Sequence, residues 1–119
     1  MHELSIAQAL VEQLEKIVRE QKATRVLRVE LAVGGLAGVD PEALRTAFPL
    51  AAEGTRAEGA ALAIEHVAPA VVCRQCASRS ASGSFPCICE HCGSADVEID
   101  AGRELLIRAV EIEQPDPVA

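Results

Sequence analysis

Aromatic residues are almost absent from this sequence of 119 residues, which contains two Phe and neither Trp nor Tyr. Positive charge is also scarce: 11 Lys and Arg stand against 18 Asp and Glu, which gives a formal net charge of -7 at pH 7. Nucleic-acid binders need a basic face, and binders of single strands stack bases on aromatic rings. The composition therefore argues against a nucleic-acid partner and predicts an aliphatic core.

The sequence also lacks a run of the roughly 20 apolar residues that a membrane-spanning helix needs. Its opening stretch, MHELSIAQALVEQLEK, is amphipathic and has no resemblance to a secretory signal. We therefore expect a soluble protein of the cytoplasm with no membrane partner. Disulfides are rare in that reducing compartment, so the cysteines need another explanation.

The five cysteines all lie in the stretch CRQCASRSASGSFPCICEHC, between Cys73 and Cys92. Two CxxC pairs stand out, Cys73 with Cys76 and Cys89 with Cys92, and the linker between them is too small and polar to build a core. Two CxxC turns can present four thiolates to one tetrahedral ion. This spacing predicts a structural zinc site formed by the two pairs.

Two other functions for a protein with this cysteine cluster remain open. A rubredoxin-like electron carrier would use the same four sulfurs to hold iron, although such sites usually have aromatic neighbours. A structural zinc-ribbon adaptor would use the acidic surface to bind protein partners. We interpret Cys87 as a spare thiol and His91 as a solvent-facing residue inside the second pair.

Hydrophobic periodicity outside the cysteine stretch predicts two helices and three strands. The first helix begins at Ser5, where Ser5 and Gln8 form a possible capping box that leaves the first four residues outside. Asp40 followed by Pro41 opens the second helix, which Pro49 should kink or shorten. The expected helices and strands are Ser5–Gln21, Pro41–Phe48, Arg25–Val33, Ala61–Val67 and Leu105–Glu113.

These elements predict an α/β (α+β) fold, with a small three-stranded sheet covered by two helices and an inserted zinc-ribbon-like domain. The expected domains are 1–69 plus 101–119, which form the α/β domain, and 70–100, which binds zinc. We expect His66 to be a partly buried histidine of the second strand. No catalytic constellation is evident, so we expect no enzyme.

The first three residues form a second candidate metal site. The Met1 amine and the amide and imidazole nitrogens of His2 can close two fused chelate rings around one ion, and the Glu3 amide can complete a plane. Planar nitrogen coordination suits Ni(II) and Cu(II) rather than Zn(II). The carboxylate of Glu3 could orient the imidazole from outside. The sequence thus predicts a nickel or copper site at Met1, His2 and Glu3.

The MHE start, the segment VGGLAGVDPEAL, the two CxxC pairs and the closing ELLIRAVEIE together resemble the hydrogenase nickel-incorporation metallochaperones of the HypA/HybF family. The resemblance implies transient Ni(II) at Met1, His2 and Glu3 and structural Zn(II) at the four paired cysteines. It also implies delivery of nickel to the large subunit of a [NiFe] hydrogenase and a partner GTPase of the HypB type. The resemblance further implies urease accessory proteins as partners in some organisms, and we expect a monomer or a weak homodimer.

The sequence departs from the family pattern around the cysteines. Glu90 stands where many members carry Pro, Cys87 is extra, and Ser78 and Ser94 occupy positions where some members carry His. A pH-dependent replacement of cysteine by histidine ligands is therefore not expected here.

Overall fold

The computed structural model describes residues 2–81 and 87–116. In chain order its elements are α1 (His2–Glu20), β1 (Arg25–Gly34), α2 (Pro41–Ala52), β2 (Ala61–Val67), β3 (Ala70–Cys73), β4 (Arg79–Ala81), β5 (Val97–Ala101) and β6 (Leu105–Glu113). They form two compact units, the first made of 1–31, 39–64 and 107–119 and the second of 32–38 and 65–106. The expected α+β class, with two helices and small sheets, is confirmed.

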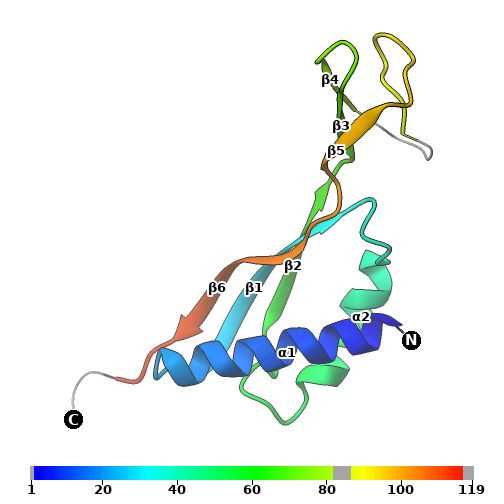
Figure 1. Cartoon of the computed structure of the whole chain (residues 1–119). Coiled ribbons are helices and arrows are strands. Elements are labelled where there is room, and N and C mark those ends of the chain that lie inside the picture. The colour runs from blue at the N-terminus through cyan, green and yellow to red at the C-terminus, as the bar shows by residue number, and fades with distance from the viewer. Residues whose placement is uncertain (1, 82–86, 117–119) are drawn as a thin grey trace. The chain divides into compact units, whose positions relative to one another are not determined.

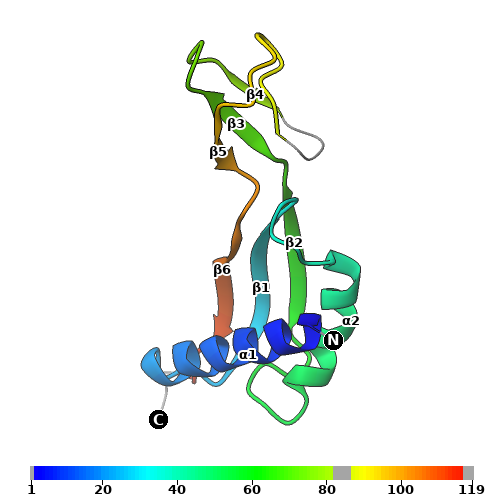
Figure 2. The same cartoon turned by 45° about the vertical axis from the view of Figure 1, so that its right-hand side comes forward.

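Helix α1 crosses the strands of the first sheet, whose order is β2-β1-β6 (Figures 1 and 2). All three predicted strands of this sheet are present. The helix turns one stripe inward, as the periodicity predicted, and the buried members of that stripe are Ala7, Leu10, Val11, Leu14 and Val18. Burial of this stripe stabilises the helix, because helices in proteins owe most of their stability to the packing of an amphipathic face.

The predicted start of α1 is wrong, because the helix begins at His2 rather than at Ser5. Glu3 lies in the first turn, where the helix dipole favours a negative charge. Its carboxylate also accepts a hydrogen bond from the backbone N–H of Asp40 at 3.1 Å. This contact with another segment ties down the first turn without the capping box expected at Ser5 and Gln8.

Helix α2 begins as predicted. Asp40 is its N-cap, and one carboxylate oxygen accepts from the backbone N–H of Glu42 at 3.0 Å and of Ala43 at 3.4 Å, with Pro41 next to the cap. The expected shortening at Pro49 is wrong, because the helix continues to Ala52. Pro49 is exposed, whereas Phe48 and Ala52 on the inward side are buried, so packing of that side keeps the last turn helical.

The core of the first unit consists of aliphatic side chains and one aromatic ring. Phe48 is the only aromatic residue among those the structure describes, and it is 2% exposed. Other large side chains that are fully buried include Leu14, Leu44, Val26 and Val29. Within the described ranges, no helix is long and apolar enough to cross a membrane.

The second sheet was not predicted. It joins β4, β3 and β5 in that order, with β3 antiparallel to both neighbours. These strands are short, and their buried residues are Ala70, Val71 and Cys73 of β3 and Ser80 of β4, so their hydrophobic pattern is too brief to be recognised in the sequence. The division into domains at residues 70 and 100 stays a prediction.

Glycines allow a close backbone crossing within the second unit, where the chain enters and leaves the cysteine stretch. The N–H of Gly34 donates to Glu104 O at 2.7 Å, and the N–H of Leu36 donates to Gly102 O at 2.6 Å. A Cβ on Gly34 would lie 2.0 Å from the Gly102 oxygen, so only glycine fits there. Gly35 N–H completes the crossing by donating to Val67 O at 3.0 Å.

We expect Phe48→Ala to lower the free energy of unfolding by about 3 to 5 kcal/mol, because it leaves a cavity in the core. Leu50→Ala is the matched control on the same helix, since Leu50 is 65% exposed, and its effect should stay within about 0.5 kcal/mol. Urea denaturation followed by circular dichroism measures both. Equal effects of the two substitutions would show that α2 does not pack as described.

Candidate metal centre

The four paired cysteines meet at one point. The sulfur atoms of Cys73, Cys76, Cys89 and Cys92 all lie within 4.8 Å of one another. Across the two pairs, the Sγ atoms of Cys73 and Cys92 are 3.5 Å apart and those of Cys76 and Cys89 are 3.6 Å apart. A tetrahedral zinc with Zn–S bonds of about 2.3 Å places its sulfurs about 3.8 Å apart. The cluster therefore has the size that a thiolate-bound zinc ion requires.

The two CxxC turns contain the same set of hydrogen bonds from backbone N–H groups to sulfur. In the first, the Sγ of Cys73 accepts from the backbone N–H of Gln75 at 3.3 Å and of Cys76 at 3.4 Å. In the second, the Sγ of Cys89 accepts from the backbone N–H of His91 at 3.3 Å and of Cys92 at 3.5 Å. Such N–H groups stabilise a thiolate, because hydrogen bonds to the charged form favour ionisation.

Each turn closes with a residue in the left-handed region. Ala77 has a φ of 64° and Gly93 has a φ of 75°, and their N–H groups both donate 2.9 Å bonds to the carbonyl of the first cysteine of their pair. Ser78 and Ser94 follow, and their carbonyls accept from the N–H of Cys73 and Cys89 at 3.0 Å and 2.9 Å. The second turn uses the residue that this conformation favours, whereas the first uses alanine.

The thiols of the two second cysteines ionise very differently without an ion. Hydrogen bonds from Ser78 lower the pKa of Cys76 to about 6. At Cys92 the backbone hydrogen bond from Ser94 favours the thiolate, but hydrogen bonding with Cys73 and desolvation outweigh it and raise the pKa to about 12. Sulfurs this close cannot all carry charge unless a cation compensates them. The donor set therefore fits a divalent metal ion.

The structure agrees with the interpretation of Cys87 as a thiol outside the cluster and of His91 as a solvent-facing residue. Within the described ranges Cys87 is half-buried and does not belong to the four-sulfur group. His91 is exposed, as expected for a residue inside a CxxC turn. The prediction for His66 is wrong, because this residue is exposed on β2 rather than partly buried.

His2 and Glu3 lie together at the exposed start of α1. The Nε2 atom of His2 is 3.6 Å from a carboxylate oxygen of Glu3, and the His2 side chain is 61% exposed. Met1, the third predicted residue of this site, lies outside the described residues.

Asp40 is the residue that sequence reasoning missed at this site. Its backbone N–H holds the carboxylate of Glu3, and this bond, together with the N–H of Glu3 itself and the nearby His2, lowers the pKa of Glu3. Glu3 therefore stays charged beside the imidazole. The sequence identified Asp40 as a helix cap, but no local pattern could pair it with a residue 37 positions earlier.

A family described as "Hydrogenase/urease nickel incorporation, metallochaperone, hypA" matches residues 1–112 of this sequence. The chain belongs to the HypA family. The resemblance carried by the MHE start and the CxxC pairs is thus confirmed, and the family is one of nickel-incorporation metallochaperones rather than of catalysts.

Relatives called hydrogenase maturation factor HypA align along their whole length. The factor from Chlorobium limicola is 45% identical over 117 residues, which is 98% of this chain and 100% of the relative. The factor from Chlorobaculum tepidum is 42% identical over 95% of this chain and 100% of its own. Membership in the family therefore covers both the N-terminal helix and the cysteine stretch.

Solved structures of HypA proteins share the fold. The solution structure of the nickel metallochaperone HypA from Helicobacter pylori matches with a TM-score of 0.69 and 23% identity, over 95% of this chain and 98% of that protein. A second HypA solution structure matches with a TM-score of 0.72 and 24% identity, over 94% and 96% of the two chains. At this identity the likeness establishes the fold.

We expect Ala77→Gly to stabilise the metal-loaded protein by about 0.5 to 1 kcal/mol. Relief of left-handed strain, about 1 to 2 kcal/mol, exceeds the entropy that glycine adds to the unfolded chain. Gly93→Ala imposes the same strain on the second turn and should cost about 1 kcal/mol, since no atom lies within 4 Å of the added Cβ. Thermal unfolding with saturating zinc measures both; destabilisation by Ala77→Gly would contradict the symmetry of the turns.

Proposed function

We propose that this HypA-family chain carries Ni(II) at its N-terminus and hands it to the large subunit of a [NiFe] hydrogenase. Nickel is bound by the Met1 amine, the amide and imidazole nitrogens of His2, and Glu3. The observation that carries the proposal is the placement of His2 at the exposed start of α1, with Glu3 fixed beside it by Asp40. Family membership supplies the cargo, because the family is described by nickel incorporation.

The start of a helix suits this chemistry. The first N–H groups of a helix lie outside its ladder of i to i−4 hydrogen bonds, so coordination by the amide nitrogens of His2 and Glu3 would leave that ladder intact. Loss of amide protons makes the chelate more negative, and the positive end of the helix dipole stabilises negative charge there. The exposed imidazole of His2 leaves the ion accessible to a partner that offers better ligands.

We infer that Cys73, Cys76, Cys89 and Cys92 hold a structural zinc ion. The four sulfurs close the coordination sphere, and a closed thiolate site exchanges its ion poorly while contributing to folding. The two sites therefore differ in role: the nickel is cargo and the zinc stays. The second sheet is too small to hold this stretch together by burial alone.

Transfer in this scheme is ligand exchange and requires no catalysed bond cleavage. Its partners are a GTPase of the HypB type, the hydrogenase large subunit and, where the organism has them, urease accessory proteins. The description of the family, which names both hydrogenase and urease, supports the hydrogenase and urease partners, whereas the GTPase is implied by the resemblance to the HypA/HybF family alone. Residues 1–69 with 101–119 form the nickel-binding part, and residues 70–100 form the zinc-binding part.

We expect calorimetry to show one nickel ion bound per chain by zinc-loaded protein that begins at Met1. A version with two additional residues ahead of Met1 should lose this binding, because its chain then has no amine at that position. His2→Ala should also lose it, because the imidazole is a ligand, while circular dichroism stays unchanged. His66→Ala is the control, since His66 is another exposed histidine and should leave binding intact.

Retention of full nickel affinity by either the extended chain or His2→Ala would refute the N-terminal chelate. Nickel bound only at Cys87, His91 or His66 would mean that the cargo site lies elsewhere. Absence of nickel binding in the native form would favour the structural adaptor.

We expect Cys73→Ser to lose zinc and to unfold the second sheet locally, because the fourth thiolate is needed to close the site. Hydrogen exchange should show loss of protection in β3 and β5, while α1 stays protected. Cys87→Ser is the matched control and should keep both zinc and protection. Iron in place of zinc in the native protein, visible as a red colour, would support the electron carrier instead.

A further inference from the structure

We propose that Asp96 is a positioning residue that fixes the first CxxC turn, so that a zinc ion in the cluster is released from the Cys89–Cys92 side first. The inference rests on the zinc site proposed above. Asp96 lies four residues after Cys92, on the segment that leaves the second turn, and it contacts the first turn. Nothing in the sequence marks it as part of the cluster.

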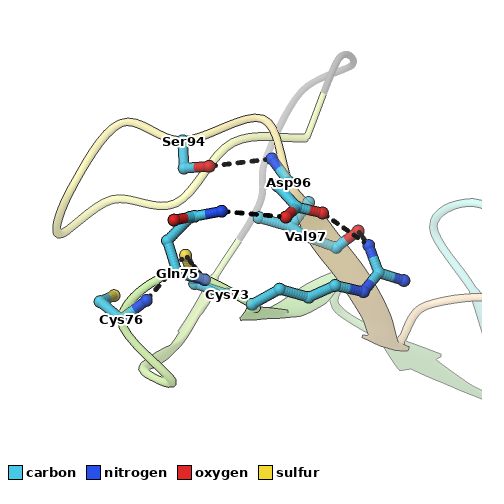
Figure 3. A network of polar contacts seen from close by, with 7 residues as sticks. Cys73, Gln75, Cys76, Ser94, Asp96 and Val97 are labelled. Carbon is cyan, nitrogen blue, oxygen red and sulfur yellow. Dashed lines mark hydrogen bonds and ion pairs between the residues drawn. The ribbon is translucent and has the colours of Figure 1, made fainter.

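The carboxylate of Asp96 accepts hydrogen bonds from the side chains of both residues that lie between Cys73 and Cys76. One carboxylate oxygen accepts from the Arg74 guanidinium at 3.0 Å, and the other accepts from the Gln75 side-chain amide at 3.1 Å (Figure 3). The Arg74 guanidinium also donates to Val97 O at 3.3 Å. The middle of the first turn is therefore held from outside through both of its side chains.

The backbone reinforces this contact. The N–H of Arg74 donates to the carbonyl of Asp96 at 3.0 Å. The N–H of Asp96 donates to the Ser94 hydroxyl at 3.0 Å (Figure 3). The guanidinium and the amide of Gln75 lower the pKa of Asp96. These contacts of Asp96 with Arg74 and Gln75, which we call the brace, thus join the first CxxC turn to the chain segment that follows the second CxxC turn.

The second turn has no equivalent brace. Within the part of the chain that the structure describes, the side chains of Glu90 and His91 make no hydrogen bond or ion pair, and both residues are exposed. The hydrogen bond that joins Glu90 and His91 to another segment is a long one, 3.4 Å, from the backbone N–H of Glu90 to the Ser80 hydroxyl. Although the bonds to sulfur are alike in the two turns, only the first has its middle residues fixed.

Asp96→Ala removes the brace and should speed the transfer of zinc to a colorimetric chelator by about 10-fold. That is the lower end of the usual effect of an outer-shell partner, and we choose it because Asp96 and Arg74 are half exposed. Arg74→Ala should produce a similar change, and the double variant should add little, since the two residues act as one unit. Asp96→Asn, which keeps one acceptor oxygen, should lie between Asp96→Ala and the native protein.

Asp100→Ala is the matched control. Asp100 lies on β5, which begins directly after Asp96, and it pairs with Arg79 of β4 rather than with a residue of a CxxC turn. Zinc transfer from this variant should stay at the native rate. Equal acceleration by Asp100→Ala and Asp96→Ala would show that any ion pair of this sheet matters and would overturn the inference.

Alkylation of the zinc-loaded protein tests the order of release. With limiting iodoacetamide, peptide mass spectrometry should find Cys89 and Cys92 modified before Cys73 and Cys76. Cys87, which lies outside the four-sulfur group, is the internal reference. In Asp96→Ala the two pairs should react at similar rates, a change that general destabilisation would not produce.

Zinc analysis of the native protein separates the two proposals. Native protein without zinc would refute the zinc site itself. Native protein with one zinc ion, released no faster from Asp96→Ala, would refute only the role of Asp96. First reaction at Cys73 and Cys76 in the native protein would also overturn it.

Discussion

Four sulfur atoms within 4.8 Å of one another are the constraint on which the second unit depends. The stretch around them has few apolar side chains, and besides Cys73 the sheet of β3, β4 and β5 buries only the small side chains of Ala70, Val71 and Ser80. Burial on this scale cannot offset the entropy of ordering the chain. The backbone is instead shaped for the sulfurs, since every CxxC turn directs N–H groups to its first cysteine. The zinc ion that we propose would hold this geometry in place.

The first unit differs, because burial of apolar side chains stabilises it while His2 at the start of α1 stays exposed. Leu14, Leu44 and Phe48 fill a compact aliphatic core, whereas His2 lies at the exposed start of α1. This contrast matches the two metal roles that we propose. A site for cargo has to be reached by a partner, and a site for a resident ion has to be closed.

The sequence allowed the helices, three strands and the grouping of the four paired cysteines to be predicted, because each depends on spacing along the chain. The contact of Glu3 with Asp40 and the brace formed by Asp96 depend on tertiary pairing, which spacing does not reveal. The start of α1 was misplaced for the same reason: the local capping signal at Ser5 was weaker than the distant hydrogen bond. The short strands β3, β4 and β5 carry too brief a pattern to be recognised.

X-ray absorption at the nickel and zinc edges of protein loaded with both metals tests the central claim most directly. Our account predicts nickel surrounded by nitrogen and oxygen with no sulfur neighbour, and zinc surrounded by four sulfurs at about 2.3 Å. The zinc spectrum should be the same with and without nickel. Sulfur neighbours around nickel, or loss of zinc on nickel addition, would show that the two ions compete for the cysteines and would contradict the separation of cargo site and structural site.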